Sequence, residues 1–234
     1  MGKKADDTTR TKLLNAAEKV FSEFGFEGAS VRTINAEAGV DSGAIHYHFG
    51  TKHDLFRAVI GRRGEILSTD RLERLARCTL TPGSADSVEQ IVAAYMMPYL
   101  NPALGTHDDR LRFARLRARL VAEQTSSDSS PLGSEHKHTG ETFIDVLATV
   151  LPHIPQRDLA DRFLIMWSSL NTLSAGLGHV ALGLPRADDP LSEFERGMPK
   201  LIRLFALMFQ APAATDDDGG VSAHRRSAKA RSTT

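Results

Sequence analysis

The sequence predicts an all-α protein made of a small and a larger helical domain. Apolar side chains recur at spacings of three and four residues through most of the chain, which is the period of an amphipathic helix. Glycine and proline interrupt these stretches, and no segment shows the alternation of apolar and polar residues that is typical of a half-buried strand. No internal repeat is evident, so a solenoid is not expected.

Length and composition fit a small N-terminal unit followed by a larger domain. The chain has 234 residues, of which 41% are hydrophobic, and this is enough to bury a core. Its 29 basic and 29 acidic residues cancel, so any attraction to nucleic acid has to be local and cannot come from the whole chain.

The chain carries no sign of export or of a membrane span. The single Cys78 excludes an intramolecular disulfide and fits a reducing compartment. The first residues lack the apolar region of a signal peptide, and the longest uninterrupted apolar run covers only residues 204–209. We therefore expect a cytoplasmic protein that does not contact the membrane.

The first domain is expected over residues 9–56, after a flexible N-terminal arm at residues 1–8. An apolar helical stripe starts at Leu13 and continues to Phe24. Gly25 is expected to end this helix, because glycine readily adopts the left-handed conformation of a C-cap.

A tight turn between two short helices is the most informative pattern in the chain. Ser30 is a suitable N-cap for a helix that Gly39 ends, since glycine can reverse the chain there. Asp41 or Ser42 is expected to cap a second helix that ends near Phe49. A second helix of this kind can enter the major groove of DNA.

The second domain, residues 57–210, is expected to consist of helices. A long connector from Lys52 to about Arg77, capped by Thr51, leads into it. The further helices are expected at residues 87–99, opened by a capping box at Ser87, and at residues 108–124, 135–151, 156–178 and 191–209. Pro199 is expected to kink the last helix or to start a new one. The tail, residues 211–234, has no core residues and is expected to be disordered.

The region from residue 9 to residue 56 resembles the DNA-binding domain of the TetR family of bacterial transcriptional regulators. The motif L-L-x-A-A-x-x-x-F-x-x-x-G-F begins at Leu13, the glycine turn follows, and Y-H-F-G-T-K closes the match at Lys52. Two departures from the family pattern are Asn35, where Ala is usual, and His46, where Tyr is common.

The resemblance implies that this domain reads double-stranded DNA, and it gives individual residues their roles. Tyr47 and Lys52 would bind phosphate, and His48 would lie near the DNA backbone. Base edges would be approached by Ala44, which can offer only an apolar contact, and by His46, which can donate or accept. The whole set implied by the resemblance is Arg32, Thr33, Ser42, Gly43, Ala44, His46, Tyr47, His48 and Lys52.

The resemblance also implies a repressor that leaves a palindromic operator when a small molecule binds to its second domain. Large or adaptable side chains there are candidates for a pocket that takes a largely apolar effector. These candidates are Met96, Met97, Tyr99, Phe113, Phe143, Met166, Trp167 and Asn171. Plain core packing is the alternative for each of them.

The apolar stripes of the last two helices predict a homodimer. They exceed what one small domain needs to bury, so the helices at residues 156–178 and 191–209 are expected to form a four-helix bundle with a second subunit. The candidate interface residues are Leu170, Leu173, Leu201, Phe205 and Met208.

No enzymatic or metal site is expected, and no cofactor. His46 and His48 are two positions apart on a helix and point in different directions, so they cannot chelate one ion. The chain has no Gly-x-Ser-x-Gly elbow, no phosphate-binding glycine loop and only one cysteine. The alternative from another class is a helical small-molecule-binding or sequestering protein with an incidental helix-turn-helix.

Overall fold

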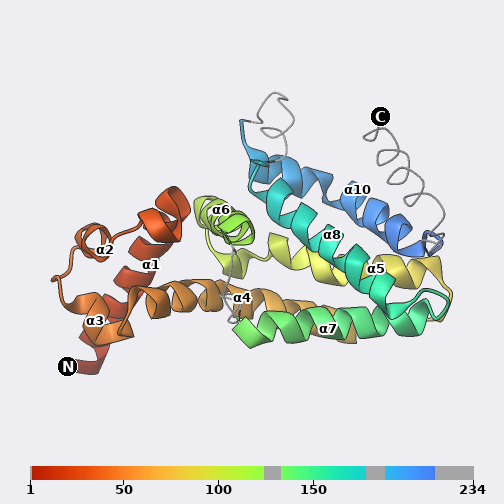
Figure 1. The fold of residues 1–234 in the computed structure, drawn as a ribbon, viewed down its shortest axis with the longest axis horizontal. Coiled ribbons are helices and arrows are strands. Elements are labelled where there is room, and N and C mark those ends of the chain that lie inside the picture. The colour runs from red at the N-terminus through yellow and green to blue at the C-terminus, as the bar shows by residue number, and fades with distance from the viewer. Residues whose placement is uncertain (1, 124–132, 178–187, 214–234) are drawn as a thin grey trace, which may run out of the picture.

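The computed structural model describes residues 2–123, 133–177 and 188–213. In these three stretches the secondary structure consists of α-helices and short 3-10 helices, without strands. The molecule is elongated, with a small group of helices at one end and a larger group at the other, and the long helix α4 runs between them (Figure 1). The expected disorder of the tail falls mainly on residues 214–234, which lie outside the described residues.

The first helix, α1 (Gly2–Gly28), is longer than expected. It begins at Gly2, so most of the stretch that was expected to be a flexible arm is helical, and this expectation was wrong. Asp6 in this part lies 3.4 Å from the ring of His48, a tertiary contact that local sequence patterns do not show. Gly25 interrupts the helix as expected, with a φ of 71°, but one more turn follows before the end at Gly28.

The helix pair in the turn region is α2 (Val31–Ala38) and α3 (Ala44–Phe49). The Ser30 cap is confirmed, because its side chain accepts from the Thr33 amide at 3.0 Å. Gly39 closes α2 with a φ of 64°, also as expected. The cap expected for α3 was wrong: neither Asp41 nor Ser42 caps it with a side chain, and the helix begins only after Gly43.

The long connector is α4 (Lys52–Ala76), and the Thr51 cap at its start is confirmed by a 3.0 Å bond from the Asp54 amide. The larger group of helices follows it. This group comprises α5 (Ala85–Met96), the 3-10 helices η1 (Met97–Leu100) and η2 (Pro102–Leu104), α6 (His107–Glu123), α7 (Gly133–Val150), α8 (Gln156–Ser174) and α10 (Pro190–Gln210).

Two expected helix signals in the larger group differ from the structure. Ser84, not Ser87, caps α5, and the Ser87 hydroxyl instead accepts from the Thr81 amide at 2.8 Å. Pro199 lies inside α10, which continues through it to Gln210. Proline lacks the backbone N–H that would donate a helical hydrogen bond at this position. Pro199 itself is exposed, so the buried face on the opposite side of α10 keeps its packing.

The apolar side chains form two clusters, and α6 takes part in the cluster of the N-terminal helices. Phe113, Leu116 and Leu120 of α6 pack with residues of α1 and α4, among them Leu13 and Phe21. The other cluster is built mainly from α5, α7, α8 and α10. The N-terminal core is therefore completed by a helix that lies more than fifty residues further along the chain than α3.

The turn glycines provide a matched test of this local structure. Gly39 has a φ of 64°, whereas Gly43 has a φ of −84°, and a Cβ at either would meet no atom within 4 Å. Gly39→Ala is expected to lower the free energy of unfolding by about 1–2 kcal/mol, because an L-residue is strained there. Gly43→Ala should change it by less than about 1 kcal/mol. Urea unfolding followed by circular dichroism measures both, and equal effects would contradict the assigned turn.

Candidate DNA-binding surface and regulatory core

The turn between α2 and α3 is held by a side chain that departs from the family pattern. Asn35 is buried on α2, and its Nδ2 donates to the Ser42 carbonyl at 2.9 Å. A hydrogen bond of this kind fixes the start of α3 relative to α2, which an alanine could not do. The departure at Asn35 therefore has a structural role.

Most of the residues expected to contact DNA are exposed on this helix pair. Arg32, Thr33, Ser42, Gly43 and His46 are exposed, and Ala44 is half-buried. Tyr47 is 79% exposed. Ile45 between them is buried and anchors α3 to the core, so the structure leaves these polar and small groups available on a surface that could face a groove.

The ring of His46 is oriented by the backbone. Its Nδ1 lies 2.9 Å from the Gly50 carbonyl, which can only accept, so the proton of the neutral ring is on Nδ1. The remaining nitrogen, Nε2, is then an acceptor. A neutral His46 can accept from the amino group of cytosine or adenine in the major groove.

His48 does not share this exposed surface. Its side chain is 8% exposed, it faces Asp6 of α1, and its ring meets that of Tyr47 edge to face. The structure thus gives His48 a place between α3 and α1, where it supports α3 and the Tyr47 ring. This is a different position from the one that the resemblance implied.

Lys52 is also engaged inside the domain. Its Nζ donates to the carbonyls of Phe26 and Ala29, at 2.8 and 3.0 Å, and lies 4.3 Å from the centre of the Phe26 ring. These carbonyls belong to the end of α1 and the link to α2, so the ammonium ties α4 to that link. Two of its three N–H groups are used in this way, which leaves one for a phosphate.

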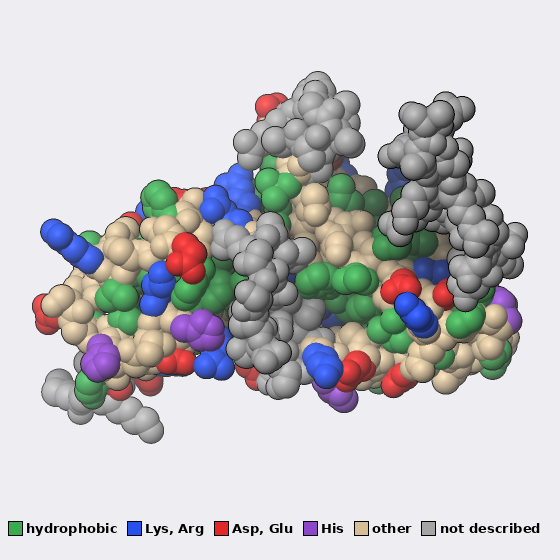
Figure 2. All heavy atoms as spheres, in the orientation of Figure 1, with side chains coloured by type: hydrophobic (Ala, Val, Ile, Leu, Met, Phe, Trp, Pro, Cys, Tyr) green, Lys and Arg blue, Asp and Glu red, His purple; other side chains and the backbone are tan. Residues whose placement is uncertain are grey.

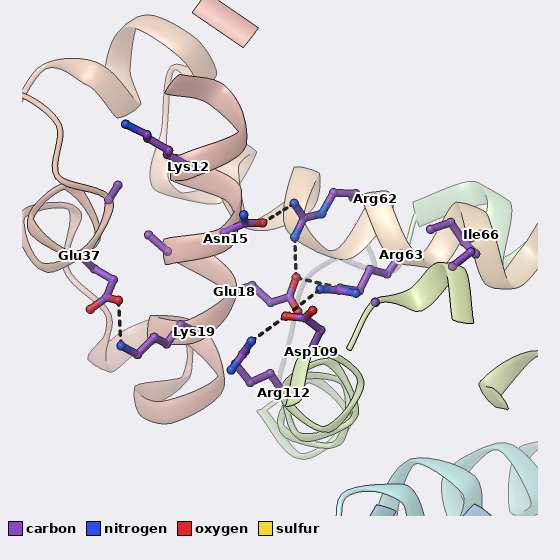
Figure 3. A pocket seen from close by; sticks show the side chains of 14 residues that line it. Lys12, Asn15, Glu18, Lys19, Glu37, Arg62, Arg63, Ile66, Asp109 and Arg112 are labelled. Atoms are coloured by element: carbon purple, nitrogen blue, oxygen red, sulfur yellow. Dashed lines mark hydrogen bonds and ion pairs between the residues drawn. The ribbon is translucent and has the colours of Figure 1, made fainter. Parts of the chain in front are cut away.

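A network of charged side chains joins α1, α4 and α6, as Figure 3 shows. The buried Glu18 carboxylate accepts from Arg62 at 2.7 Å and from Arg63 at 2.9 Å. Arg63 also donates to the Leu104 carbonyl and lies 3.7 Å from Asp109 on α6. The network borders a pocket of about 710 Å³ between the three helices.

Asp109 is the acidic group that α6 contributes to this network. Burial would raise the pKa of its carboxyl, but hydrogen bonds from Thr106 and Arg112 and the charge of Arg63 lower the pKa to about 2. A lowered pKa stabilises the folded state at neutral pH, and this contribution disappears as the pH falls toward 2. The contact between α6 and α4 is therefore at full strength in the physiological range.

The residues expected to line a ligand pocket lie in the interior, and only part of them face a cavity. Met96, Phe143 and Met166 are buried in the larger apolar cluster, and Met97 and Trp167 pack against it. Tyr99 and Phe113 line a small cavity together with two arginines, Arg110 and Arg117. Asn171 is reached through Arg117, which donates to its Oδ1 and to the Tyr99 hydroxyl.

The expected dimer residues were wrong in part. Leu170 and Phe205 are buried in the core of their own subunit, so they cannot form an interface, while Leu173, Leu201 and Met208 are half-buried. The neighbouring faces of the same two helices are open instead. Their exposed apolar side chains are Leu164 and Ile165 on α8 and Leu204 and Leu207 on α10. Figure 2 shows hydrophobic side chains at the surface where α8 lies.

Two parts of the chain match family models of bacterial regulators. Residues 13–59 match the family of bacterial regulatory proteins of the tetR type, and residues 93–207 match the tetracyclin repressor-like C-terminal domain. The first match contains α2, α3 and the start of α4, and the second contains α6, α8 and most of α10. The chain belongs to the TetR family.

A curated relative resembles this TetR-family chain over less than a third of its length. The HTH-type transcriptional repressor AcnR of Corynebacterium glutamicum is 37% identical over 73 residues, which are 30% of this chain and 39% of that protein. The chain therefore matches about two fifths of the length of this relative.

Solved structures resemble it over most of its length. A transcriptional regulator from Rhodococcus sp. Rha1 has 23% identity and a TM-score of 0.51, with 86% of this chain and 95% of that chain covered. FadR of Bacillus subtilis, solved in complex with stearoyl-CoA, has 13% identity and a TM-score of 0.53, with 84% and 97% covered. At these identities the likeness shows a shared fold.

TetR-family regulators are non-enzymatic DNA-binding proteins. No three His, Cys, Asp or Glu side chains in the described stretches come together in a way that could hold a metal ion. Burial raises the pKa of the Cys78 thiol, which keeps it in its unreactive form. Within the described residues no helix is long and apolar enough to cross a membrane.

Two functional candidates were missed by the sequence analysis, Arg71 and Arg117. Arg117 of α6 and Arg71 of α4 are both buried, although arginine usually lies at the surface. The signal that could have revealed them is their register. Arg117 follows Phe113 by four positions, and Arg71 stands four positions from both Leu67 and Leu75, so both arginines fall on apolar stripes.

The two hydrogen bonds by which Lys52 ties α4 to the link between α1 and α2, which we call the Lys52 clamp, yield a prediction on stability. Lys52→Met is expected to lower the free energy of unfolding by about 2 kcal/mol, because two carbonyls lose a charged donor. Lys12→Met, at an exposed position of α1, is the control and should change it by less than about 0.5 kcal/mol. Urea denaturation in the absence of DNA measures both values. Equal stability of the two variants would show that the clamp does not hold the link between α1 and α2.

Proposed function

We propose that this chain is a homodimeric transcriptional repressor that binds a palindromic DNA operator and is released from it by a small-molecule effector. The observation that carries the proposal is the exposed surface of α2 and α3. It presents Arg32, Thr33, His46 and Tyr47 beside small residues at the start of α3, on a helix pair that a glycine turn and the Asn35 bond hold rigid. Because the chain as a whole carries no net charge, a few rigidly positioned hydrogen-bond donors have to provide its contacts to DNA.

In the proposed complex, α3 enters the major groove of each half-site. Ser42, Gly43 and Ala44 at its start allow close approach, and His46 reads one base through its outward nitrogen. Tyr47 and Arg32 contact phosphates, and Lys52 adds its remaining N–H group to a phosphate beside them. His48 is left out of this set because it packs against α1.

The proposed dimer interface is the exposed apolar row on α8 and α10. Leu164 and Ile165 are 57% and 54% exposed, and Leu204 and Leu207 are 57% and 67% exposed. Exposed large apolar side chains on two helices that pack against each other favour an interaction surface, and a two-fold axis through it would cover these side chains in both subunits at once. Such a dimer would act in the cytoplasm, where bacterial DNA lies.

The proposed effector site is the interior of the larger helix group, and α6 provides the coupling to DNA. FadR of Bacillus subtilis, which shares this fold, was solved in complex with stearoyl-CoA, and this supports the binding of a small molecule by the present chain. On one side, Arg117 of α6 binds Asn171 of α8. On the other, Arg119 donates to the Glu23 carbonyl of α1 at 2.8 Å, and Asp109 faces Arg63.

A shift of α6 would therefore move α1 directly. This route is shorter than one through a tilt of the whole connector α4. The effector stabilises the conformer that spaces the two recognition helices wrongly, and operator affinity falls by the coupling free energy, typically about 1–3 kcal/mol.

A footprint on the DNA that flanks the gene of this protein tests the proposed function. The expected result is a protected, two-fold symmetric site with half-sites about one helical turn apart, roughly 34–36 Å. Absence of any sequence-specific protection would favour a sequestering protein with an incidental helix-turn-helix and would overturn the proposal.

The roles of His46 and Tyr47 are separable by substitution. Tyr47→Phe should weaken binding to operator and to unrelated DNA alike, by about 1 kcal/mol per subunit, because one phosphate hydrogen bond is lost. His46→Ala should instead relax the base preference at one position of each half-site, by about 1 kcal/mol. Fluorescence anisotropy with single-base operator variants gives both quantities. A change of base preference in Tyr47→Phe would contradict this placement of α3.

The interface prediction concerns two residues of α10. The double variant Leu204→Glu, Leu207→Glu should be a folded monomer, since both side chains are exposed in the single subunit. Phe205→Glu, between them in sequence, should instead lose several kcal/mol of stability, because it buries a charge in the core. Analytical ultracentrifugation at micromolar concentration and thermal unfolding separate the two outcomes. A double variant that remains dimeric would place the interface elsewhere.

A further inference from the structure

Two buried arginines of the larger helix group, one on α4 and one on α6, lie against the same tyrosine ring. Arg71 is 1% exposed and Arg117 is 5% exposed. The Cζ of Arg71 lies 3.8 Å from the centre of the Tyr95 ring and 5.3 Å from that of Tyr99, and the Cζ of Arg117 lies 4.5 Å from the Tyr99 ring. One aromatic ring therefore contacts both cations, and the four side chains form what we call the arginine–tyrosine cluster.

The hydrogen bonds of this cluster leave donors unused. Arg71 donates its Nε to the Tyr95 carbonyl at 3.0 Å, and Arg117 donates an Nη2 group to the Tyr99 hydroxyl and to Asn171. The Nη2 of Arg71, the Nη1 of Arg117 and the hydroxyl of Tyr95 are buried and have no acceptor among the described residues. Neither arginine forms an ion pair with a described carboxylate, whereas Arg110 nearby is paired with Glu195 at 2.6 Å.

The charges of the cluster are therefore not compensated by an anion in the described part of the chain. Burial would raise the pKa of the Tyr99 phenol, yet the positive charges of Arg117 and Arg71 lower it below its ordinary value. Stacking on tyrosine rings offsets only part of the cost of burying two guanidinium groups, and full compensation needs a counter-charge with matching acceptors.

The space beside the cluster is narrow and has an apolar side. The cavity that Tyr99 and Arg117 border is also lined by the polar residues Arg110 and Ser174 and by the apolar residues Leu104, Phe113, Ala114 and Leu191. Its volume of about 10 Å³ holds about one water molecule. A ligand whose polar end reaches Arg117 could therefore place an apolar body against the apolar side, but it would have to separate α6 from the helices packed against it.

We infer that the effector of the proposed regulator is an organic acid, whose carboxylate binds between Arg71 and Arg117 and whose apolar body lies against Phe113 and Leu104. The inference rests on the proposed function, since it names the chemical class of that effector. A carboxylate supplies acceptors for the unused N–H groups in the planar geometry that guanidinium prefers. It gives the largely apolar effector expected from the sequence a negatively charged head group.

The location of the two arginines connects this binding to the DNA-binding end. Arg71 lies on α4 and Arg117 on α6, and both helices take part in the charged network around Glu18 and Arg63. An anion that draws the two guanidinium groups together shifts α4 and α6 relative to each other, and the relative position of these two helices sets the position of α1.

Three eight-carbon probes that differ only in their head group test the inference: octanoate, octanol and octylamine. Trp167, the single tryptophan, lies on α8 one turn from Asn171, so its fluorescence reports on this region. The unmodified dimer is expected to bind octanoate at least ten-fold more tightly than octanol, and octylamine least of all. Octanol or octylamine binding as tightly as octanoate, or no binding of octanoate, overturns the inference.

Substitution then locates the head group. Arg71→Met and Arg117→Met should each reduce the preference for octanoate over octanol at least ten-fold, and Arg117→Lys should retain part of it. Arg203→Met, at an exposed position on α10, is the control and should leave the preference unchanged. If a methionine variant fails to fold, the comparison of the three probes on the unmodified protein still tests the inference. A preference that survives in both folded methionine variants overturns the assignment.

Operator binding without any probe separates this inference from the proposed function. If the footprint is present and octanoate neither binds nor weakens it, the organic-acid inference fails while the proposed function stands. If no specific footprint exists, the proposed function itself fails, whatever octanoate does to the fluorescence.

Discussion

A carboxylate buried on α1, Glu18, accepts from two arginines of α4, and one of these, Arg63, continues the contact to η2 and α6. Removing either partner of such a pair leaves an uncompensated buried charge, which costs about 3–5 kcal/mol. The position of the N-terminal helices relative to the larger group therefore depends on this contact. The apolar side chains of α6 that complete the N-terminal core reinforce it.

This arrangement explains how one chain can combine a rigid reading surface with a responsive interior. In the N-terminal helices, hydrogen bonds between elements that lie next to each other hold the exposed surface in place. They are the Ser30 cap, the Asn35 bond and the Lys52 clamp. Between the domains, the restraints pass through α6 and are of two kinds. Asp109 and Arg119 make polar contacts with Arg63 and with the Glu23 carbonyl, and Phe113, Leu116 and Leu120 pack into the N-terminal core. A shift of α6 is therefore transmitted to the N-terminal helices by both kinds of contact.

Local sequence rules predicted local structure well and tertiary partners poorly. Ser30, Gly39 and Thr51 were predicted from capping chemistry, because a cap depends on residues within one helical turn. Asp6 and Lys52 could not be placed in this way. Their partners, His48 and the carbonyl groups at the end of α1, are brought near by the packing of the three helices.

The faces of the last two helices show a second limit of prediction from the sequence. Both α8 and α10 carry apolar side chains on more than one stripe, so periodicity identifies amphipathic helices without stating which apolar side chains are inside. Phe205 packs in the core while Leu204 beside it is exposed. Charged residues present the opposite difficulty. Arg117 is one of five arginines on α6, and its residue type suggests exposure, but its register is that of the apolar stripe and it is buried. Where residue type and position on the helix point to different environments, the position is the better guide to whether a side chain is buried.

The open row of Leu164, Ile165, Leu204 and Leu207 has a consequence for gene dosage. If two copies have to meet before both halves of an operator can be read, the amount of active repressor rises with the square of the monomer concentration while dimers are scarce. Promoter occupancy would then respond to expression level more steeply than for a protein that binds as a single subunit. A cell could set this threshold by changing how much of the chain it makes, without altering a residue that touches DNA or ligand.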